Sequence, residues 1–509
     1  MINITVGNHG CKIVPENRSE LLAVLGYIRQ HLVQSEQTFN PRTRQYEVEQ
    51  KAIFASATSD KSELRILRSD LEPLLSHLDF MGYDSSRYTL QENLSTDVYE
   101  TIDIEMHPNF TPRNSQQQQA VDFALVPNKI TRVLQAATGF GKTFCGYWTA
   151  CQLKRRTGFI MEPSHIKTWL KDAKAYCTIR DKEILVIQGS ESLRAVMELK
   201  ALGQLTHKFI FFSAVTLRNY ITDYENKDEP FPFDVKPEDL MSYLGIGYLI
   251  RDEAHEAIHA LCKQTMYFNV PKILFLSATL VSDNRFINTI YDRVYPKEDM
   301  WVSEPNKHIH VRSCFYHASS KIGLTGKGPR GYSHANYEKT ILKKASLKKE
   351  YWELIRQCVT VSYIKSHKPK LKCLVIVATI KMAEYLSKMA REQWPQFTVG
   401  CYVAGAKSEE LYERDIVFST PKGAGTGVDI PNLYVGWNTV AIGSTQLQRQ
   451  IMGRLREVKA YPDMSPYFFM LFNEDVPQHR AYEKKRQIDN VGRCKSYQKV
   501  PLGVTLGLK

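Results

Sequence analysis

The amino-acid sequence predicts an α/β protein with two tandem parallel-sheet domains and a small α+β domain before them. From about residue 110 to residue 304, short apolar β-rich runs alternate with helical patterns, and the alternation resumes from about residue 310 onward. Apolar strands separated by helices are typical of parallel sheets that are covered on both faces. A glycine-rich loop between a strand pattern and a helical pattern, at Gln135–Thr143, fits the same architecture.

These blocks predict an N-terminal domain at residues 1–108, a first α/β domain at 109–308 and a second at 309–509. The strands expected in the first α/β domain are ITRVLQ, TGFIME, KFIFFSAV, IGYLIRD and KILFLSAT. Those expected in the second are CLVIVAT, TVGCYVAG, RDIVFST, NTVAIG and PYFFMLF.

Length and composition are ordinary for a globular protein with several domains. The chain has 509 residues, of which 43% are hydrophobic and 24% are charged. Its start lacks the pattern of a secretion signal, and no apolar run approaches the roughly 18 residues needed to cross a bilayer. The ten cysteines include no CxxC pair. We therefore expect a reducing, cytoplasmic environment, no structural zinc and no membrane partner.

The net charge of +13 is concentrated in a basic linker at residues 321–372, which has thirteen Lys or Arg against three acidic residues. Aromatic residues are interleaved there, namely Tyr332, Tyr337, Tyr351, Trp352 and Tyr363. Cations with aromatic rings suit a polyanion that has stackable bases. The alternative is a solvated surface connector, since charge runs are often no more than that.

The glycine-rich loop has the residues of a phosphate-binding loop. It comprises Ala136, Ala137, Thr138, Gly139, Phe140, Gly141, Lys142 and Thr143. Small residues let backbone N–H groups approach phosphate oxygens, and the following helix N-terminus adds positive potential. Lys142 would neutralise the terminal phosphates of ATP, and the Thr143 hydroxyl would bind Mg²⁺. Ala136 stands where the general motif has glycine.

A second segment, about 110 residues later, supplies acidic groups at the end of a strand. The strand pattern at Tyr248–Ile250 leads to the tetrapeptide DEAH, Asp252–His255. Asp252 would hold Mg²⁺, and Glu253 would orient or deprotonate the attacking water. The next predicted strand ends in SAT, Ser277–Thr279. The sequence therefore predicts a nucleoside-triphosphate hydrolase.

The ordered series AxxGxGKT, DEAH, SAT and QxxGR, over about residues 110–460, resembles superfamily 2 helicases and translocases. The resemblance implies two RecA-like domains that close on ATP and Mg²⁺ and step along a nucleic acid. In the upstream segment, Gln116 or Gln117 is the expected adenine contact. In QIMGRLRE, Arg454 or Arg456 is the expected arginine finger, because Glu457 occupies the usual second arginine position.

The family's remaining motifs imply further contacts. EPSH resembles the first backbone-gripping motif, in which Ser164 and His165 would contact the nucleic acid, with Trp169 where relatives often have a polar residue. The segment STPKGAGTGVDIP would contribute Gly427 and Asp429 to the nucleotide site. The other backbone contacts implied by the resemblance are Ser213, Thr216, Thr379 and Thr420.

The N-terminal segment FNPRTRQYEVEQKAIF resembles the DNA-binding domain of phage branch-migration helicases, and Lys327–Trp352 resembles a segment of the same enzymes. The segment STPKGAGTGVDIP is also similar to the corresponding motif of poxvirus transcript-release helicases. Arg42, Arg44, Tyr46 and Lys51 are the expected N-terminal nucleic-acid contacts. The resemblance implies action on branched or double-stranded DNA, in company with recombination or single-strand-binding proteins. An RNA helicase or transcript-release factor, and a restriction-type translocase on duplex DNA, remain alternatives.

Overall fold

The structure, a computed structural model, describes residues 1–40, 45–95, 99–305, 307–328, 331–407, 409–425 and 430–508. The chain forms two compact units. The first consists of Met1–Ala136, Phe140–Leu280 and Asn284–Ser303, and the second of Ala137–Gly139, Val281–Asp283 and Glu304–Lys509. Within the described ranges, no helix is long and apolar enough to cross a membrane.

The core of the first unit is a seven-stranded parallel sheet. Its order is β10 (Ile184–Ile187), β11 (Phe209–Ser213), β9 (Thr157–Met161), β12 (Tyr248–Arg251), β13 (Ile273–Ser277), β8 (Thr131–Gln135) and β14 (Met300–Val302). Every neighbouring pair is parallel. The strands β9, β11 and β13 are buried over their whole length, as their continuous apolar runs predict.

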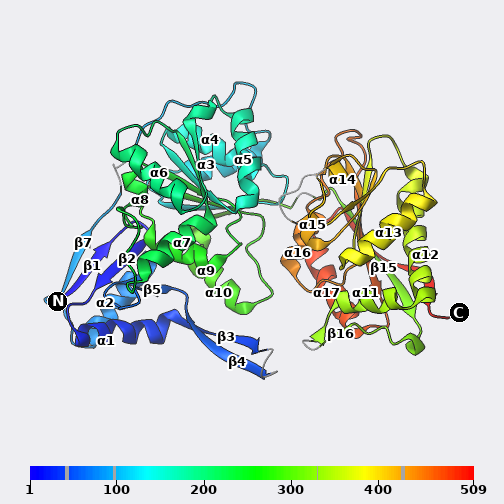
Figure 1. The fold of residues 1–509 in the computed structure, drawn as a ribbon, viewed down its shortest axis with the longest axis horizontal. Helices are drawn as coiled ribbons and strands as arrows, with labels where there is room; N and C mark the ends of the chain where they lie inside the picture. Colours follow the sequence, from blue (N-terminus) through cyan, green and yellow to red (C-terminus); the bar gives the residue numbers. More distant parts are fainter. Residues whose placement is uncertain are drawn as a thin grey trace. The chain divides into compact units, whose positions relative to one another are not determined.

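Helices cover both faces of this sheet (Figure 1). One face packs against α3 (Ser115–Leu125), α4 (Lys142–Leu153) and α5 (Pro163–Tyr176). The other packs against α6 (Ser190–Ala201), α7 (Ala214–Glu225), α9 (Ile258–Tyr267) and α10 (Arg285–Val294). The short helix α8 (Leu240–Tyr243) precedes β12.

The N-terminal region has a mixed five-stranded sheet in the order β5 (Ala55–Ala57), β6 (Leu64–Leu67), β2 (Gly10–Val14), β1 (Ile2–Val6) and β7 (Tyr88–Glu92). It also contains α1 (Arg18–Tyr27), α2 (Leu71–Phe80) and an antiparallel ribbon of β3 (Val33–Asn40) and β4 (Gln45–Ala52). Alternate residues of β1 and β2 are buried, as expected for a sheet with one covered face. The expected contacts Arg42 and Arg44 lie outside the described residues, between β3 and β4.

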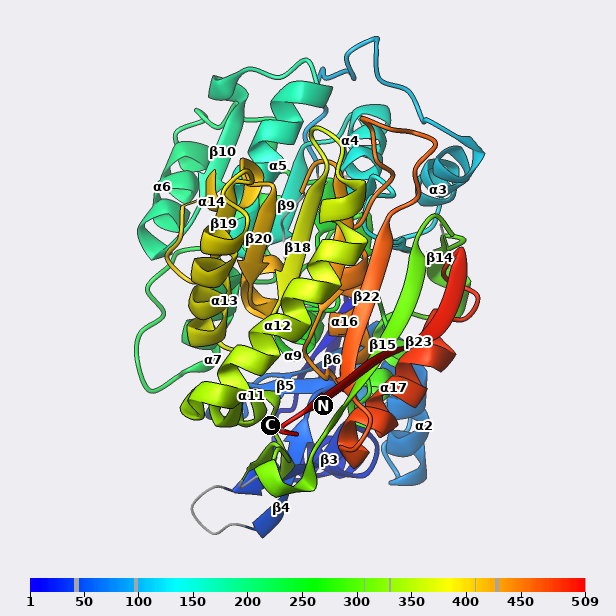
Figure 2. The same cartoon turned by 90° about the vertical axis from the view of Figure 1, so that its right-hand side faces the viewer.

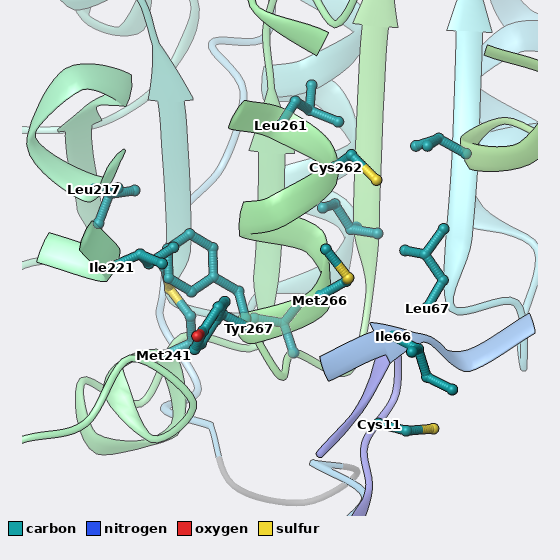
Figure 3. Close-up of a cluster of buried hydrophobic side chains, with 14 of the residues drawn as sticks. Cys11, Ile66, Leu67, Leu217, Ile221, Met241, Leu261, Cys262, Met266 and Tyr267 are labelled. Carbon is teal, nitrogen blue, oxygen red and sulfur yellow. The ribbon is translucent and has the colours of Figure 1, made fainter. Parts of the chain in front are cut away.

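The N-terminal sheet shares a hydrophobic cluster with the first parallel-sheet domain (Figure 3). Cys11 and Ile66 of the N-terminal strands belong to the same cluster as Leu261 and Met266 of α9. A Cβ atom on Gly10 would lie 2.3 Å from the Met266 carbonyl oxygen, so this approach requires glycine.

Polar contacts reinforce this junction. The Glu238 carboxylate pairs with Lys12 at 2.6 Å and also with Arg65. The Tyr224 hydroxyl donates to Glu63 at 2.8 Å. Because the apolar and polar contacts join the two parts so extensively, we expect them to unfold together.

The core of the second unit is also a seven-stranded parallel sheet. Its order is β19 (Val399–Tyr402), β20 (Ile416–Ser419), β18 (Lys372–Ile376), β21 (Leu433–Asn438), β22 (Tyr467–Asn473), β15 (His310–Ala318) and β23 (Ser496–Leu506). Every neighbouring pair is parallel. The predicted class is therefore confirmed: α/β with two tandem RecA-like sheets and a small mixed N-terminal sheet.

Three helices, α11 (His334–Lys343), α12 (Ala345–Ser362) and α13 (Ile380–Gln393), pack on one face of the second sheet. Figure 2 shows α12 and α13 lying across that face. The other face packs against α16 (Thr445–Met452). The remaining elements are β16 (Lys327–Gly328), β17 (Gly331–Tyr332), α14 (Glu409–Tyr412), α15 (Pro421–Gly425) and α17 (Pro477–Asn490).

One predicted strand is wrong. NTVAIG was expected to form it, but β21 is the preceding run, Leu433–Asn438. The Asn438 side-chain oxygen accepts a hydrogen bond from the Val440 amide at 3.1 Å, which forms a turn and ends the strand. Val440, Ala441 and Ile442 are buried as well, so hydrophobicity alone does not separate strand from loop here.

The interpretation of the basic linker as a base-stacking surface is wrong for most of its aromatic rings. Tyr337, Tyr351, Trp352 and Tyr363 are all buried, with at most 6% exposure. They belong to the core beneath α11 and α12, because three lie on the apolar faces of these helices and Tyr363 directly follows α12. Most of the lysines of the linker lie on the other faces, so the alternative of a solvated charged surface holds for these helices.

The shared cluster predicts a strong effect of truncating Ile66, which is 0% exposed. Ile66→Ala should lower the free energy of unfolding by about 2–5 kcal/mol, because it leaves a cavity where the N-terminal sheet packs against α9. Leu90→Ala, at a position in β7 that is 49% exposed, should change it by less than about 0.5 kcal/mol. Urea unfolding followed by circular dichroism measures both, and equal effects would contradict the shared core.

Candidate nucleotide and nucleic-acid sites

The two predicted motifs meet because their strands flank a common neighbour. In the sheet order, β13 lies between β8, which leads to the phosphate loop, and β12, which leads to DEAH. The Ala136 amide donates to the Ser277 carbonyl at 2.9 Å, and the Ala254 amide donates to the Leu276 carbonyl at 2.9 Å. The carboxyl ends of three parallel strands thus hold both motifs at one edge, the usual ligand site of such sheets.

The phosphate loop leads directly into the N-terminus of a helix. Gly139 and Gly141 have φ angles of +86° and +94°, in the left-handed region that favours glycine. Helix α4 begins at Lys142, directly after Gly141. The Lys142 ammonium group donates to the Ala136 carbonyl at 3.0 Å, so it lies folded over its own loop. The N-terminal amide groups and this cation suit a phosphate group.

Of the two candidate glutamines, Gln117 holds the phosphate loop. Its side-chain amide donates to the Phe140 carbonyl at 3.0 Å and accepts from the Arg113 amide at 2.9 Å. The Arg113 guanidinium group also donates to Phe140, at 2.8 Å. Gln117 is buried and Gln116 is half-buried on the same helix. Which of the two contacts adenine stays a prediction.

The Asp252 carboxylate is held by two side chains of α5. The Trp169 indole N–H donates to Asp252 Oδ2 at 2.8 Å, and His165 Nδ1 lies 3.6 Å from the same oxygen. Burial acts to raise the pKa of Asp252, but the interactions with His165 and then Trp169 outweigh it and hold the pKa below its usual range. The pKa of His165 is raised in turn by Asp252. Asp252 is therefore an oriented, ionised carboxylate.

Glu253 has the properties of a general base. Burial, and then the neighbouring charge of Asp252, raise its pKa to about 7. Its φ angle of +45° places a non-glycine residue in the left-handed region, a strain of about 1–3 kcal/mol that is typical of functional sites. A carboxyl group that titrates near neutrality suits the exchange of a proton with water.

The last residue of DEAH connects the acidic turn to SAT. His255 Nδ1 lies 3.0 Å from the Ser277 hydroxyl and 3.2 Å from Glu253 Oε2. Burial, and then the charge of Lys142, lower the pKa of His255 to about 4, so its ring is neutral.

Sequence reasoning missed three side chains that hold the acidic turn. Trp169, as described, contacts Asp252. Tyr295 donates to the Ala254 carbonyl at 2.7 Å, and Tyr291 donates to the His255 carbonyl at 3.2 Å. Tyr291 lies in α10 and Tyr295 directly follows it, more than 30 residues from the motif, and only their place in or beside an amphipathic helix is visible in the sequence.

The side chains present fit a magnesium ion. Thr143 stands in the first turn of α4, and Asp252 supplies an ionised carboxylate. Among the described residues, no hydrogen bond engages Asp252 Oδ1, so this oxygen remains for a cation. Hydroxyl and carboxylate oxygens, completed by phosphate, are the ligands that Mg²⁺ prefers.

A groove of about 530 Å³ in the first unit lies where three helices begin. Its lining includes Pro163 at the start of α5, Ser190 at the start of α6 and Val215 in the first turn of α7. Within the described part of the chain, none of the three N-cap side chains caps its helix. Three helix N-termini, each the positive end of a helix dipole, suit the phosphates of a nucleic-acid backbone.

The predicted nucleic-acid contacts of this unit differ in their exposure. Ser164 is exposed at the first turn of α5. Ser213 and Thr216 line the groove but are buried, and the Thr216 hydroxyl accepts from the Gly189 amide at 2.8 Å. His165 was expected to contact the nucleic acid. Its side chain is instead buried against Asp252. The start of α6 at Ser190 was not predicted as a nucleic-acid contact.

In the second unit, Thr379 and Thr420 both cap helices. The Thr379 hydroxyl accepts from the Met382 amide at 3.2 Å and donates to the buried Glu338 carboxylate at 2.8 Å. Burial raises the pKa of Glu338 to about 7. Thr420 accepts from the Gly423 amide at 3.3 Å. The predicted residues Gly427 and Asp429 lie outside the described residues.

The two candidate finger arginines lie just after α16. Arg454 is 7% exposed and its amide donates to the Ile451 carbonyl at 3.1 Å. Arg456 is half-buried. The choice between them, and their role, stay predictions.

Comparison with known proteins supports the first unit's nucleotide chemistry. Residues 95–282 match the ResIII family model, described as "Type III restriction enzyme, res subunit". This segment contains the phosphate loop, DEAH and SAT, and it covers less than half of the chain. No curated protein shows significant sequence similarity to the chain.

Several solved structures are similar to this chain. A Saccharomyces cerevisiae Dbp5 variant bound to a Gle1 variant and IP6 has a TM-score of 0.49 at 12% identity, covering 77% of this chain and 90% of that chain. The Pyrococcus furiosus Hef helicase domain has a TM-score of 0.43 at 12% identity, covering 74% and 98%. T4 UvsW has a TM-score of 0.33 at 13% identity, covering 98% and 99%.

The raised pKa of Glu253 predicts the pH dependence of ATP hydrolysis. The ionised base is needed, so the rate should rise with pH, be half-maximal near pH 7 and then level off. Glu256→Gln removes a nearby negative charge that helps to raise this pKa, so the half-maximal pH should fall. Steady-state rates of ATP hydrolysis at saturating ATP, from about pH 5.5 to about pH 9, measure both effects. A profile flat across pH 7 would contradict the assignment.

The same shift affects stability with a definite sign. The folded Glu253 carboxyl group binds its proton more tightly than an ordinary carboxyl group of pKa 4.5. Its contribution to the free energy of unfolding therefore falls as pH rises from about 4.5 to about 7, and it changes little above that.

Proposed function

We propose that this protein is an ATP-driven nucleic-acid motor that unwinds or branch-migrates branched DNA. The observation that carries the proposal is the sharing of α5 between two sites. Its first turn lines the groove of helix N-termini, and its Trp169 holds Asp252 of the ATPase site. A helix that belongs to both sites can make hydrolysis respond to a bound nucleic acid.

The chemistry assigned to the residues follows from their surroundings. Lys142 and the amide groups of the phosphate loop bind the terminal phosphates. Mg²⁺, held by Thr143 and Asp252, would neutralise charge on the phosphates. Glu253 accepts a proton from the attacking water, because its pKa is close to neutrality. The contact between His255 and the Ser277 hydroxyl connects this turn to the end of β13.

Branched DNA as the substrate is supported by sequence features. The segment FNPRTRQYEVEQKAIF and the stretch Lys327–Trp352 resemble parts of phage branch-migration helicases. The net charge of +13 favours binding to a polyanion. Action on branched DNA would imply recombination or single-strand-binding proteins as partners.

A second candidate is a translocase that moves on duplex DNA without separating its strands. The family match favours it, because that family is described by a restriction-enzyme subunit. The two candidates differ in strand displacement. A duplex translocase hydrolyses ATP on duplex DNA but displaces no strand, whereas the proposed motor separates strands.

The test is ATP-dependent strand displacement on a panel of Holliday junctions, forks, R-loops, linear duplexes and RNA duplexes. We expect displacement on branched DNA and none by Lys142→Ala, which lacks the cation that neutralises the terminal phosphates. DNA-stimulated hydrolysis without displacement would favour the duplex translocase. Displacement of RNA duplexes alone would favour an RNA helicase.

A charge at the start of α6 tests the groove. Ser190 is exposed and lines the groove. Ser190→Glu should weaken DNA binding by about five- to tenfold and reduce the salt dependence by about one phosphate contact, because it repels phosphate. A glutamate favours a helix N-terminus, so folding should not suffer. Ser190→Gln, neutral and of similar size, is the control, and equal binding by both variants would exclude the groove from the DNA path.

A further inference from the structure

Asp252 receives both of its side-chain contacts from one helix. The Trp169 indole N–H and His165 Nδ1 approach the same atom, Oδ2, at 2.8 Å and 3.6 Å. The two residues are four positions apart on α5, so they lie one above the other on one helix face. The carboxylate plane is therefore set by the position of α5, while Oδ1 is left for the cation.

Trp169 is held firmly in this position. It is 3% exposed, and its ring packs against those of Tyr147 and Phe159, with centroids 5.3 Å and 5.7 Å away. Its carbonyl group accepts from the Tyr147 hydroxyl at 2.7 Å. Because close-packed side chains transmit displacement, a shift of α5 moves the indole N–H group and with it the carboxylate.

The N-terminal end of the same helix leads to the groove. Pro163 lines it, and Ser164 is exposed beside it. His165 follows directly and already contacts Asp252. Only one residue thus separates a group that faces the groove from a group that faces the metal-binding carboxylate. The α5 N-terminus is also the positive end of the helix dipole, which would attract a phosphate.

We propose that Trp169 and His165 are positioning residues that couple occupancy of the helix N-terminal groove to the metal-binding orientation of Asp252. A nucleic-acid phosphate at the start of α5 biases the helix position, and the two side chains pass that bias to Oδ2. Nucleic acid and the magnesium nucleotide then strengthen each other's binding, as reciprocal coupling requires. This inference rests on the proposed function, because it presumes that the groove binds nucleic acid and that Asp252 binds Mg²⁺.

Trp169→Phe tests the coupling, because it keeps an aromatic ring for packing and removes the N–H donor. Binding of a fluorescent ADP analogue is measured with Mg²⁺ and with EDTA, each with and without a forked DNA oligonucleotide. In the unaltered protein, the fork should raise the affinity with Mg²⁺ by at least about fivefold, and it should have little effect with EDTA. In Trp169→Phe this enhancement should disappear, while the affinity in EDTA stays the same.

Trp148→Phe is the matched control, since it makes the same chemical change on α4, where the ring packs near Phe144 at 5.7 Å. It should keep the enhancement. His165→Gln removes the second contact and should reduce the enhancement in part, and it decides the question if Trp169→Phe does not fold. An enhancement unchanged in both Trp169→Phe and His165→Gln would overturn the proposal. Absence of nucleotide binding, or of the fork effect, in the unaltered protein would instead refute the proposed function.

Discussion

The parallel pairing of β8, β13 and β12 is the constraint on which the first unit depends. It brings the ends of three strands to one edge, with Ala136 and Ala254 each hydrogen-bonded to the backbone of β13. The phosphate loop and the acidic turn are about 110 residues apart in the sequence, and only this register makes them one site. It also carries a strained Glu253, because the surrounding hydrogen bonds hold its backbone in the left-handed region.

Around this edge, polar side chains of the covering helices determine the electrostatics. Helix α5 orients Asp252 through Trp169. Tyr291 of α10 and Tyr295, just after it, hold the DEAH backbone. Each contact satisfies a buried polar group, which is costly to leave unpaired. The same burial separates the protonation behaviour of the two acidic neighbours. Asp252 remains ionised because it has donors, whereas Glu253 titrates near neutrality because burial dominates.

The parts outside the two parallel sheets are each built into the hydrophobic core of their unit. The N-terminal sheet is joined to α9 through a shared core and through Glu238 and Glu63, so it is part of the folded first unit. The basic linker is built into the second unit in the same way. Its aromatic residues form core, and Glu338 of α11 reaches across to the Ala378 amide at 2.6 Å. A charged surface and an apolar core are two faces of the same helices there.

The sequence by itself determined the fold class, most strands of both sheets and the identity of the phosphate loop and acidic turn, because these depend on local hydrophobicity and on residue types at fixed spacing. Strand limits were less certain where two buried runs adjoin, as at Asn438. The tertiary structure alone decided that Trp169 and His165 serve Asp252, that Gln117 holds the phosphate loop, and that the linker's aromatic residues face inward. Those roles depend on contacts between elements distant in sequence, and neither periodicity nor spacing along one element carries such information.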